Sequence, residues 1–168
     1  LARCHAAKLA RFGRHRPTAL RISTEISMSI FTTKSELQSA VHEWSADATS
    51  ATGVYGHISS WDTSRINDMS YLFCGNTQSN MVGNGCNVIA QQFNADINAW
   101  DLGQVTSMKN MFYDALLFDQ QLSAWDVGNV QLLQGTFQNA VRFDQDLNDW
   151  NVGSATEFYG MFVVHSAP

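Results

Sequence analysis

The sequence predicts an α/β fold: a short right-handed solenoid of about four 25-residue coils, each built from a short strand, a turn and a short helix. Three observations predict it. One motif recurs at an offset of 25 residues, aromatic residues fill the same columns of each copy, and the apolar spacing changes from extended to helical within each copy. A unit of this size cannot bury both of its apolar faces, so neighbouring copies must stack and share one core.

Three complete copies of the motif start at Phe93, Phe118 and Phe143, and a divergent copy starts near residue 54. We number them repeats 1 to 4 in chain order, the divergent copy being repeat 1. The extra residues between repeats 1 and 2 are rich in Gly and Asn and predict an inserted loop over 75–92. The predicted core consists of three aromatic columns: Trp61, Trp100, Trp125 and Trp150; Phe93, Phe118 and Phe143; and Phe112, Phe137 and Phe162.

The two halves of each repeat differ in their apolar spacing. In FDQQLSAW, which starts at Phe118, the Phe and the Leu lie four residues apart, which places both on one face of an extended strand. In VTSMKNMFYDA, which starts at Val105, the apolar residues follow helical spacing. Trp-Asp-Val-Gly lies between the halves and predicts a turn in which the Asp side chain accepts backbone N–H groups.

A different pattern precedes the repeats. Thr33 and Glu36 form a predicted capping box before an apolar stripe, so we expect a helix over 34–45 that covers the first repeat. The domain organisation is then a basic leader or flexible segment over 1–29 and a repeat domain over 30–168. No matching cap pattern follows repeat 4, so either this repeat closes the stack itself or the natural chain continues.

Charge divides the chain into a basic and an acidic part. The net charge is −5, but residues 1–24 carry six basic side chains and no acidic one. The acidic remainder lacks the Lys and Arg that phosphate contacts need, so we expect no nucleic-acid partner. No apolar run reaches the ~18–20 residues of a membrane-spanning helix, so no transmembrane segment is expected. The basic segment resembles an organelle transit peptide in composition; an RNA- or membrane-contacting arm and plain upstream sequence are the alternatives.

The first half of each complete repeat carries polar residues that we call the polar ladder. If Phe and Leu point inward, alternation along a strand points these residues outward, as a candidate ligand surface. A solvated face kept polar for solubility is the alternative. Calcium would suit the oxygen-rich array, but no calcium-binding motif is present. The polar ladder is Asn94, Asp96, Asn98, Asp119, Gln121, Ser123, Asp144, Asp146 and Asn148.

Nothing in the sequence indicates an enzyme. The acidic residues of the polar ladder recur in every repeat, whereas a catalytic pair needs one pocket with two different environments. The sequence contains no metal-binding His spacing, no nucleophile motif and no glycine-rich phosphate loop. We therefore predict no catalytic residue, no metal site and no cofactor. The Trp column is interpreted as core in preference to a carbohydrate-stacking platform.

Cys74 and Cys86 enclose most of the inserted loop. Two cysteines that close one loop suggest a disulfide bond, and hence an oxidising compartment, with two free thiols as the alternative. A zinc site would need two further ligands nearby, and the sequence shows none.

The pattern F-N/D-x-D-I/L-S/N-x-W-D-V-x-x-V-x-x-M-x-x-M-F-x-x-A resembles the BspA-like leucine-rich-repeat surface proteins over residues about 30–165, in particular their 25-residue mycoplasma-lipoprotein branch. The opening FTTKSELQSAVHEW and the insertion around Cys74 and Cys86 are similar to bacterial and algal versions. The resemblance implies a leucine-rich-repeat-like solenoid displayed outside the cell, with adhesion or recognition as the usual role and no enzymatic activity.

Two functions from different classes follow. The first is a non-enzymatic extracellular or cell-surface recognition or adhesion module that binds a protein or glycan partner through one face of the stack. The alternative is a structural subunit that binds copies of itself or packs into a filament, matrix or larger assembly, because an open end of a stack is a template for another chain. The basic segment motivates a third, an accessory subunit in an organelle lumen.

Overall fold

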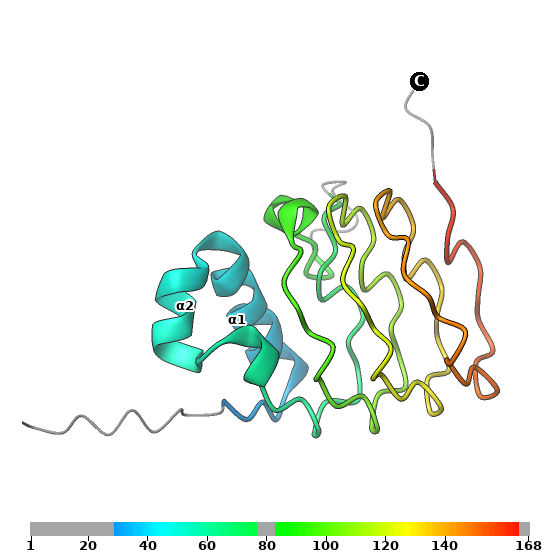
Figure 1. The fold of residues 1–168 in the computed structure, drawn as a ribbon, viewed down its shortest axis with the longest axis horizontal. Helices are drawn as coiled ribbons and strands as arrows, with labels where there is room; N and C mark the ends of the chain where they lie inside the picture. Colours follow the sequence, from blue (N-terminus) through cyan, green and yellow to red (C-terminus); the bar gives the residue numbers. More distant parts are fainter. Residues whose placement is uncertain (1–28, 77–82, 165–168) are drawn as a thin grey trace, which may run out of the picture.

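The computed structural model describes residues 29–76 and 83–164, so the predicted leader lies almost wholly outside the described residues. Two α-helices, α1 (Lys34–Ala46) and α2 (Ala48–Tyr55), lie at one end of the molecule. The repeats follow side by side, and repeat 4 lies at the opposite end (Figure 1). Two short 3₁₀ helices, η1 (Ile58–Ser60) and η2 (Val88–Gln92), lie in repeat 1 and in the inserted loop.

Helix α1 begins at the capping box. The Thr33 hydroxyl accepts the backbone N–H of Glu36 at 3.2 Å, and the Glu36 carboxylate accepts the backbone N–H of Thr33 at 3.0 Å. Its apolar stripe is buried, and Trp44 packs edge-on against Trp61 of repeat 1 with ring centroids 6.0 Å apart. The helix therefore covers the first repeat.

Helix α2 was not predicted, because its sequence ATSATGVY has no apolar stripe and buries only Ala51 among its residues. A local cap begins it: the Asp47 carboxylate accepts the backbone N–H groups of Thr49 and Ser50 at 3.0 and 3.2 Å. The N-cap residue Asp47 is thus the feature of the sequence from which α2 could have been predicted.

The predicted α/β solenoid of short strands and short helices is wrong for the described residues. Apart from the 3₁₀ turn η1, repeats 1 to 4 contain turns and isolated parallel bridges, with no strand and no α-helix among the residues described. The bridges join Asp68 to Ser107, Ser107 to Leu132 and Leu132 to Glu157, so equivalent positions of successive repeats still lie next to each other.

The second half of each repeat is a series of overlapping turns. In repeat 2, the N–H groups of Met108, Asn110 and Phe112 donate to carbonyls of repeat 3 at 2.8–2.9 Å. The carbonyls of the same residues accept N–H groups three residues further along their own repeat. Asn110 has a φ of 54°, a left-handed conformation that an α-helix cannot contain. Successive turns bring every third or fourth residue inward, which explains the helical apolar spacing without a helix.

The first halves of repeats 2 to 4 are not strands, because no backbone hydrogen bond joins them to the neighbouring repeats in the described structure. In repeat 1, only an isolated bridge joins Asp62 to Ile30, in the segment before α1. The tryptophan side chains make the link. The indole Nε1–H groups of Trp100, Trp125 and Trp150 donate to backbone carbonyls of the preceding repeat at 2.8, 3.0 and 3.2 Å. Each buried indole therefore satisfies its one donor while its ring fills the core.

The aromatic columns run along the stack. Phe73, Phe112, Phe137 and Phe162 have ring centroids 5.2, 5.4 and 5.5 Å apart in turn. Trp61 stacks on Trp100 at 6.1 Å, and Trp125 on Trp150 at 6.3 Å. Burial ends in repeat 4: Phe143 is only partly buried, and Phe162, predicted as core, is 58% exposed. The other predicted core residues are buried: Trp61, Trp100, Trp125, Trp150, Phe93, Phe118, Phe112 and Phe137.

The predicted disulfide bond joins Cys74 to Cys86, and both cysteines are buried. It closes part of the predicted inserted loop, of which residues 77–82 lie outside the described residues. The alternative of two free thiols is thereby excluded.

Replacing two glycines by alanine should have opposite effects. Gly135 has a φ of +61°, and a Cβ there would overlap the Asn110 side chain, so Gly135→Ala should destabilise the fold by about 1–2 kcal/mol. Gly53 lies in α2 with open space around it, so Gly53→Ala should stabilise by about 0.5–1 kcal/mol. Urea unfolding of both variants measures this, and equal effects of the two would contradict the left-handed turn at Gly135.

Candidate functional site

The polar ladder lies at the surface, as the sequence analysis expected, although the strand that was to orient it does not form. Two of its nine members, Asn98 and Asp119, are partly buried. The exposed members are Asn94, Asp96, Gln121, Ser123, Asp144, Asp146 and Asn148.

Three members of the polar ladder bind the next repeat. The Asn94 side-chain oxygen accepts the backbone N–H of Asp119 at 2.9 Å, and Asn98 accepts that of Ala124 at 3.0 Å. The Asp119 carboxylate accepts the backbone N–H of Asp144 at 3.1 Å and the side-chain amide of Gln145 at 2.7 Å. These residues therefore join successive repeats and are not free to bind a ligand without loss of those bonds.

The other members of the ladder have no described bond to another repeat. Asp96 and Asp146 accept the backbone N–H two residues further on, at 2.9 and 2.8 Å, which fixes a local turn. Gln121 and Ser123 are exposed and have no hydrogen bond in the described structure. Asp96, Gln121 and Ser123 are thus the part of repeats 2 and 3 that can contact a partner without disturbing the stack.

Acid should weaken the link at Asp119. Hydrogen bonds from Gln145 and then from the Asp144 backbone lower the pKa of Asp119 below its ordinary value of 3.8. A lowered pKa gives stability that is present above the ordinary value and is lost as the pH falls through the folded-state pKa. Asp119→Asn should keep the bonds, as Asn94 does one repeat earlier, and should reduce the loss of stability below pH ~4.

Urea unfolding of parent and Asp119→Asn at pH 7 and at pH 3 measures this effect. The two proteins should have similar free energies of unfolding at pH 7. Between pH 7 and pH 3 the variant should lose less of its free energy of unfolding than the parent. An unchanged acid dependence would mean that the carboxylate is not bonded in this way.

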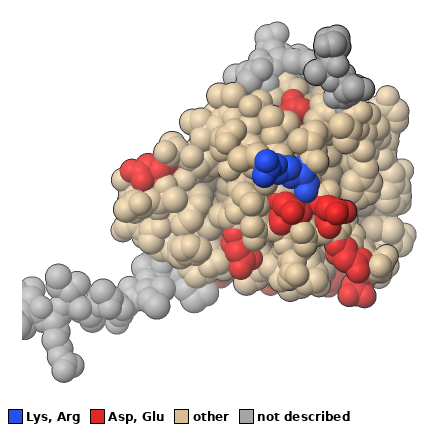
Figure 2. Space-filling model, turned by 45° about the horizontal axis from the view of Figure 1, so that its top comes forward, with Lys and Arg blue, Asp and Glu red and all other residues tan. Residues whose placement is uncertain are grey.

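Acidic side chains outnumber basic ones on the face shown in Figure 2. Among the described residues the one ion pair joins Lys34 of α1 to Asp68 of repeat 1 at 2.9 Å, and Lys34 also contacts the Ser70 hydroxyl. Burial acts to raise the pKa of Asp68, but bonds from Ser70 and Lys34 outweigh it and lower the pKa. The pair thus fastens α1 to repeat 1. No group of His, Cys, Asp or Glu that could hold a metal ion occurs among the described residues.

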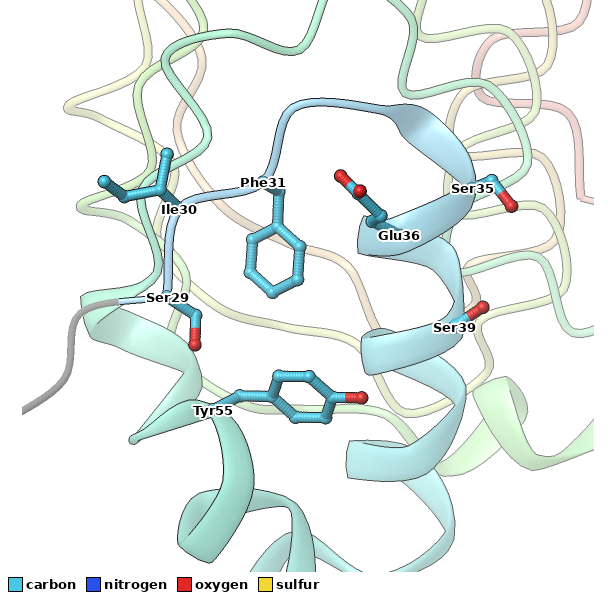
Figure 3. Close-up of a pocket in the computed structure, with 7 residues that line it drawn as sticks. All are labelled: Ser29, Ile30, Phe31, Ser35, Glu36, Ser39 and Tyr55. Atoms are coloured by element: carbon cyan, nitrogen blue, oxygen red, sulfur yellow. The ribbon is translucent and has the colours of Figure 1, made fainter.

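A groove of about 620 Å³ opens between α1, the end of α2 and the segment that leads into α1 (Figure 3). Phe31 and Tyr55 form its aromatic part, with ring centroids 6.1 Å apart. Its one carboxylate, Glu36, is already bonded in the capping box. Burial and a hydrogen bond with Glu43 raise the pKa of Tyr55 above its ordinary value. The groove could not be predicted from the sequence, because its residues come from separate segments.

The exposed end of repeat 4 was also not predicted from sequence. It carries a hollow of about 250 Å³ lined by Leu147, Trp150, Val152, Phe158, Met161 and Phe162. In repeats 2 and 3 the equivalent residues are covered by the next repeat. The sequence-based assignment of Phe162 to the core assumed such a cover.

This geometry defines a repeat protein whose units are joined by backbone bridges, indole hydrogen bonds and aromatic columns. The chain matches the model of the family described as "Mycoplasma protein of unknown function, DUF285" over residues 26–88 and 46–167, and it belongs to that family. No curated protein and no solved structure matches the chain significantly. Within the described residues, none of the helices has the length and apolar character that crossing a membrane requires.

Proposed function

We propose that the protein is a BspA-like surface protein: a non-enzymatic recognition or adhesion module that acts outside the cell or at its surface. The observation that carries this proposal is the exposed part of the polar ladder. Asp96, Gln121 and Ser123 present carboxylate, amide and hydroxyl groups at the surface of two adjacent repeats. A rigid, repeated array of polar groups can meet a protein or glycan partner at several points at once.

Two further features support the proposal. The Cys74–Cys86 disulfide favours an oxidising compartment, such as the exterior of the cell. The surface is weakly charged, since charged residues are only 15% of the chain, and the exposed ladder residues Gln121 and Ser123 add an amide and a hydroxyl to it. Such a surface hydrogen-bonds to neutral polar partners and, being acidic on balance, is poorly suited to nucleic acid.

Location and binding test this proposal together. Antibody labelling of cells that have not been permeabilised should show the native protein at the surface. The purified protein should bind intact cells, and the triple variant Asp96→Ala, Gln121→Ala, Ser123→Ala should bind them at least tenfold more weakly. The variant Gln92→Ala, Gln104→Ala changes exposed amides outside the ladder and should bind like the parent. Internal location, or equal binding by both variants, would refute the proposal.

The alternative function is a structural subunit that joins a larger assembly. The exposed apolar end of repeat 4 is the observation that favours it. Sedimentation over a range of protein concentrations separates the two functions, because a discrete monomer supports recognition and concentration-dependent polymers support assembly.

A further inference from the structure

The two ends of the stack differ. At one end α1 covers repeat 1, with Leu37, Ala40 and Val41 fully buried. Repeat 4 lies at the other end (Figure 1). Its Phe158 is 44% exposed and its Phe162 is 58% exposed. Exposed aromatic residues in a row with a hollow between them mark a surface that lacks its partner.

The backbone of repeat 4 also lacks partners at this end. In repeat 3 the N–H groups of Leu133, Gly135 and Phe137 donate to carbonyls of repeat 4 at 2.8–2.9 Å. The equivalent groups of repeat 4 belong to Phe158, Gly160 and Phe162, and they have no acceptor in the described structure. An unpaired row of backbone donors is a template for another chain.

Two further groups at the end of repeat 4 lack the partners that their equivalents in repeat 3 have. The carbonyl of Leu122 in repeat 3 accepts the Trp150 indole, whereas the equivalent carbonyl of Leu147 accepts no indole in the described structure. The carboxylate of Asp119 accepts two N–H groups of repeat 4, and the equivalent carboxylate of Asp144 is exposed. The end of repeat 4 therefore presents the groups that one repeat uses to hold the next.

A second copy of this chain does not complement that end. The carbonyls of Ser107, Lys109 and Met111, which form the acceptor row of repeat 2, already bind repeat 1. In repeat 1 the equivalent acceptor positions include Ser70 and Leu72. Both residues are buried, and α1 covers this repeat. Two copies that met through repeat 4 would bring donor row against donor row. The complementary surface is a repeat whose carbonyl row is free.

We propose that the end of repeat 4 binds a further, uncapped 25-residue repeat of the same type, which is called the partner below. The partner's carbonyls accept the N–H groups of Phe158, Gly160 and Phe162. Its Phe stacks on Phe162, continuing the column at its spacing of 5.2–5.5 Å, and its Trp indole donates to the carbonyl of Leu147. This inference rests on the geometry of the repeats and is independent of the recognition proposal.

A fluorescently labelled peptide with the sequence of residues 118–142 serves as the probe, because it is a complete repeat of this chain. Anisotropy should show saturable binding to the full chain. At a concentration 100-fold above Kd the peptide should raise the Tm by roughly 5–10 °C. A peptide in which the positions of Phe118, Trp125 and Phe137 carry Ser should not bind.

Two variants of the chain locate the site. Phe162→Asp should keep the fold, because the ring is already largely exposed, and should weaken peptide binding at least tenfold. Val54→Asp is the matched control, since Val54 is 65% exposed on α2 at the covered end, and it should bind like the parent. Circular dichroism melts check that both variants are folded.

Three results would overturn the proposal. The first is no binding and no change of Tm at the solubility limit of the peptide. The second is equal binding by parent and Phe162→Asp. The third is self-association of the chain without peptide that Phe162→Asp abolishes, which would make a second copy the occupant.

Discussion

Trp125→Ala should destabilise the protein by about 3–5 kcal/mol, which is a large part of the stability of a typical domain. Trp125 is buried and stacks on Trp150, and its ring centroid lies 6.2 Å from that of Phe112. Truncation removes these contacts, leaves a cavity in repeat 3 and deprives the Ile97 carbonyl of its indole donor. Urea unfolding followed by tryptophan fluorescence and circular dichroism measures the change.

Two control variants accompany Trp125→Ala: one separates the ring from its N–H group, and the other changes an exposed residue. Trp125→Phe keeps an aromatic ring in the column but removes the donor, so it should cost less than Trp125→Ala. Gln121→Ala changes an exposed residue of the same repeat and should stay within about 0.5 kcal/mol of the parent. If Gln121→Ala destabilised as much as Trp125→Ala, the assignment of inside and outside in the first half of the repeat would be wrong.

Phe112→Ala should destabilise the protein by a similar amount, about 3–5 kcal/mol. The Phe112 ring is fully buried, with ring centroids of Phe73, Phe118 and Phe137 at 5.2, 4.1 and 5.4 Å. Phe162 occupies the same column in repeat 4 but stacks on Phe137 alone and is 58% exposed. Phe162→Ala should therefore cost less than half as much.

The comparison of these two variants isolates position in the stack, because the substitution and the column are the same. Thermal unfolding of both proteins at one concentration is sufficient. Equal losses of stability would mean that Phe162 is covered in solution, for example by self-association, and sedimentation of the parent would then show a species larger than the monomer.

The sequence contained enough information to align the repeats and to choose the aromatic columns. Identical residues at equal offsets can stack on each other only if neighbouring repeats are in register. The stacked rings of Phe73, Phe112 and Phe137 show this register. Thr33 and Glu36 likewise give the start of α1, because a capping box is a local interaction. Phe162 was misassigned because membership of a column does not show whether a neighbouring repeat covers the ring.

The local structure of the repeats could not be predicted from apolar spacing. Overlapping turns and an α-helix both bring every third or fourth residue inward, so the same pattern fits either. The left-handed residues decide between them. One column of them is Tyr71, Asn110, Gly135 and Gly160, all with φ between 54° and 67°, and a second contains Asp114 and Asn139, with φ of 55° and 57°. Asn and Gly in one column indicate positive φ, although Tyr71 hides the signal in repeat 1.

The exposure of most polar-ladder residues was predictable from the sequence, and their hydrogen bonding was not. Polar residues next to inward-pointing Phe and Leu residues tend to reach the surface, so the ladder residues could be chosen from the sequence. That Asn94 and Asp119 bond to the next repeat depends on how the neighbouring backbone is placed, which sequence spacing does not give. The groove at Phe31 and the end of repeat 4 are features of assembly and carry no motif of their own.

The bridges between the repeats give the stack an electrical direction. In repeat 2 the peptide unit between Ser107 and Met108 accepts from Met69 on one side and donates to Leu132 on the other, and those at Lys109–Asn110 and Met111–Phe112 point the same way. In an ordinary sheet successive peptide dipoles alternate and largely cancel. Here the aligned units add, as they do in a helix, so partial positive charge collects at the end of repeat 4.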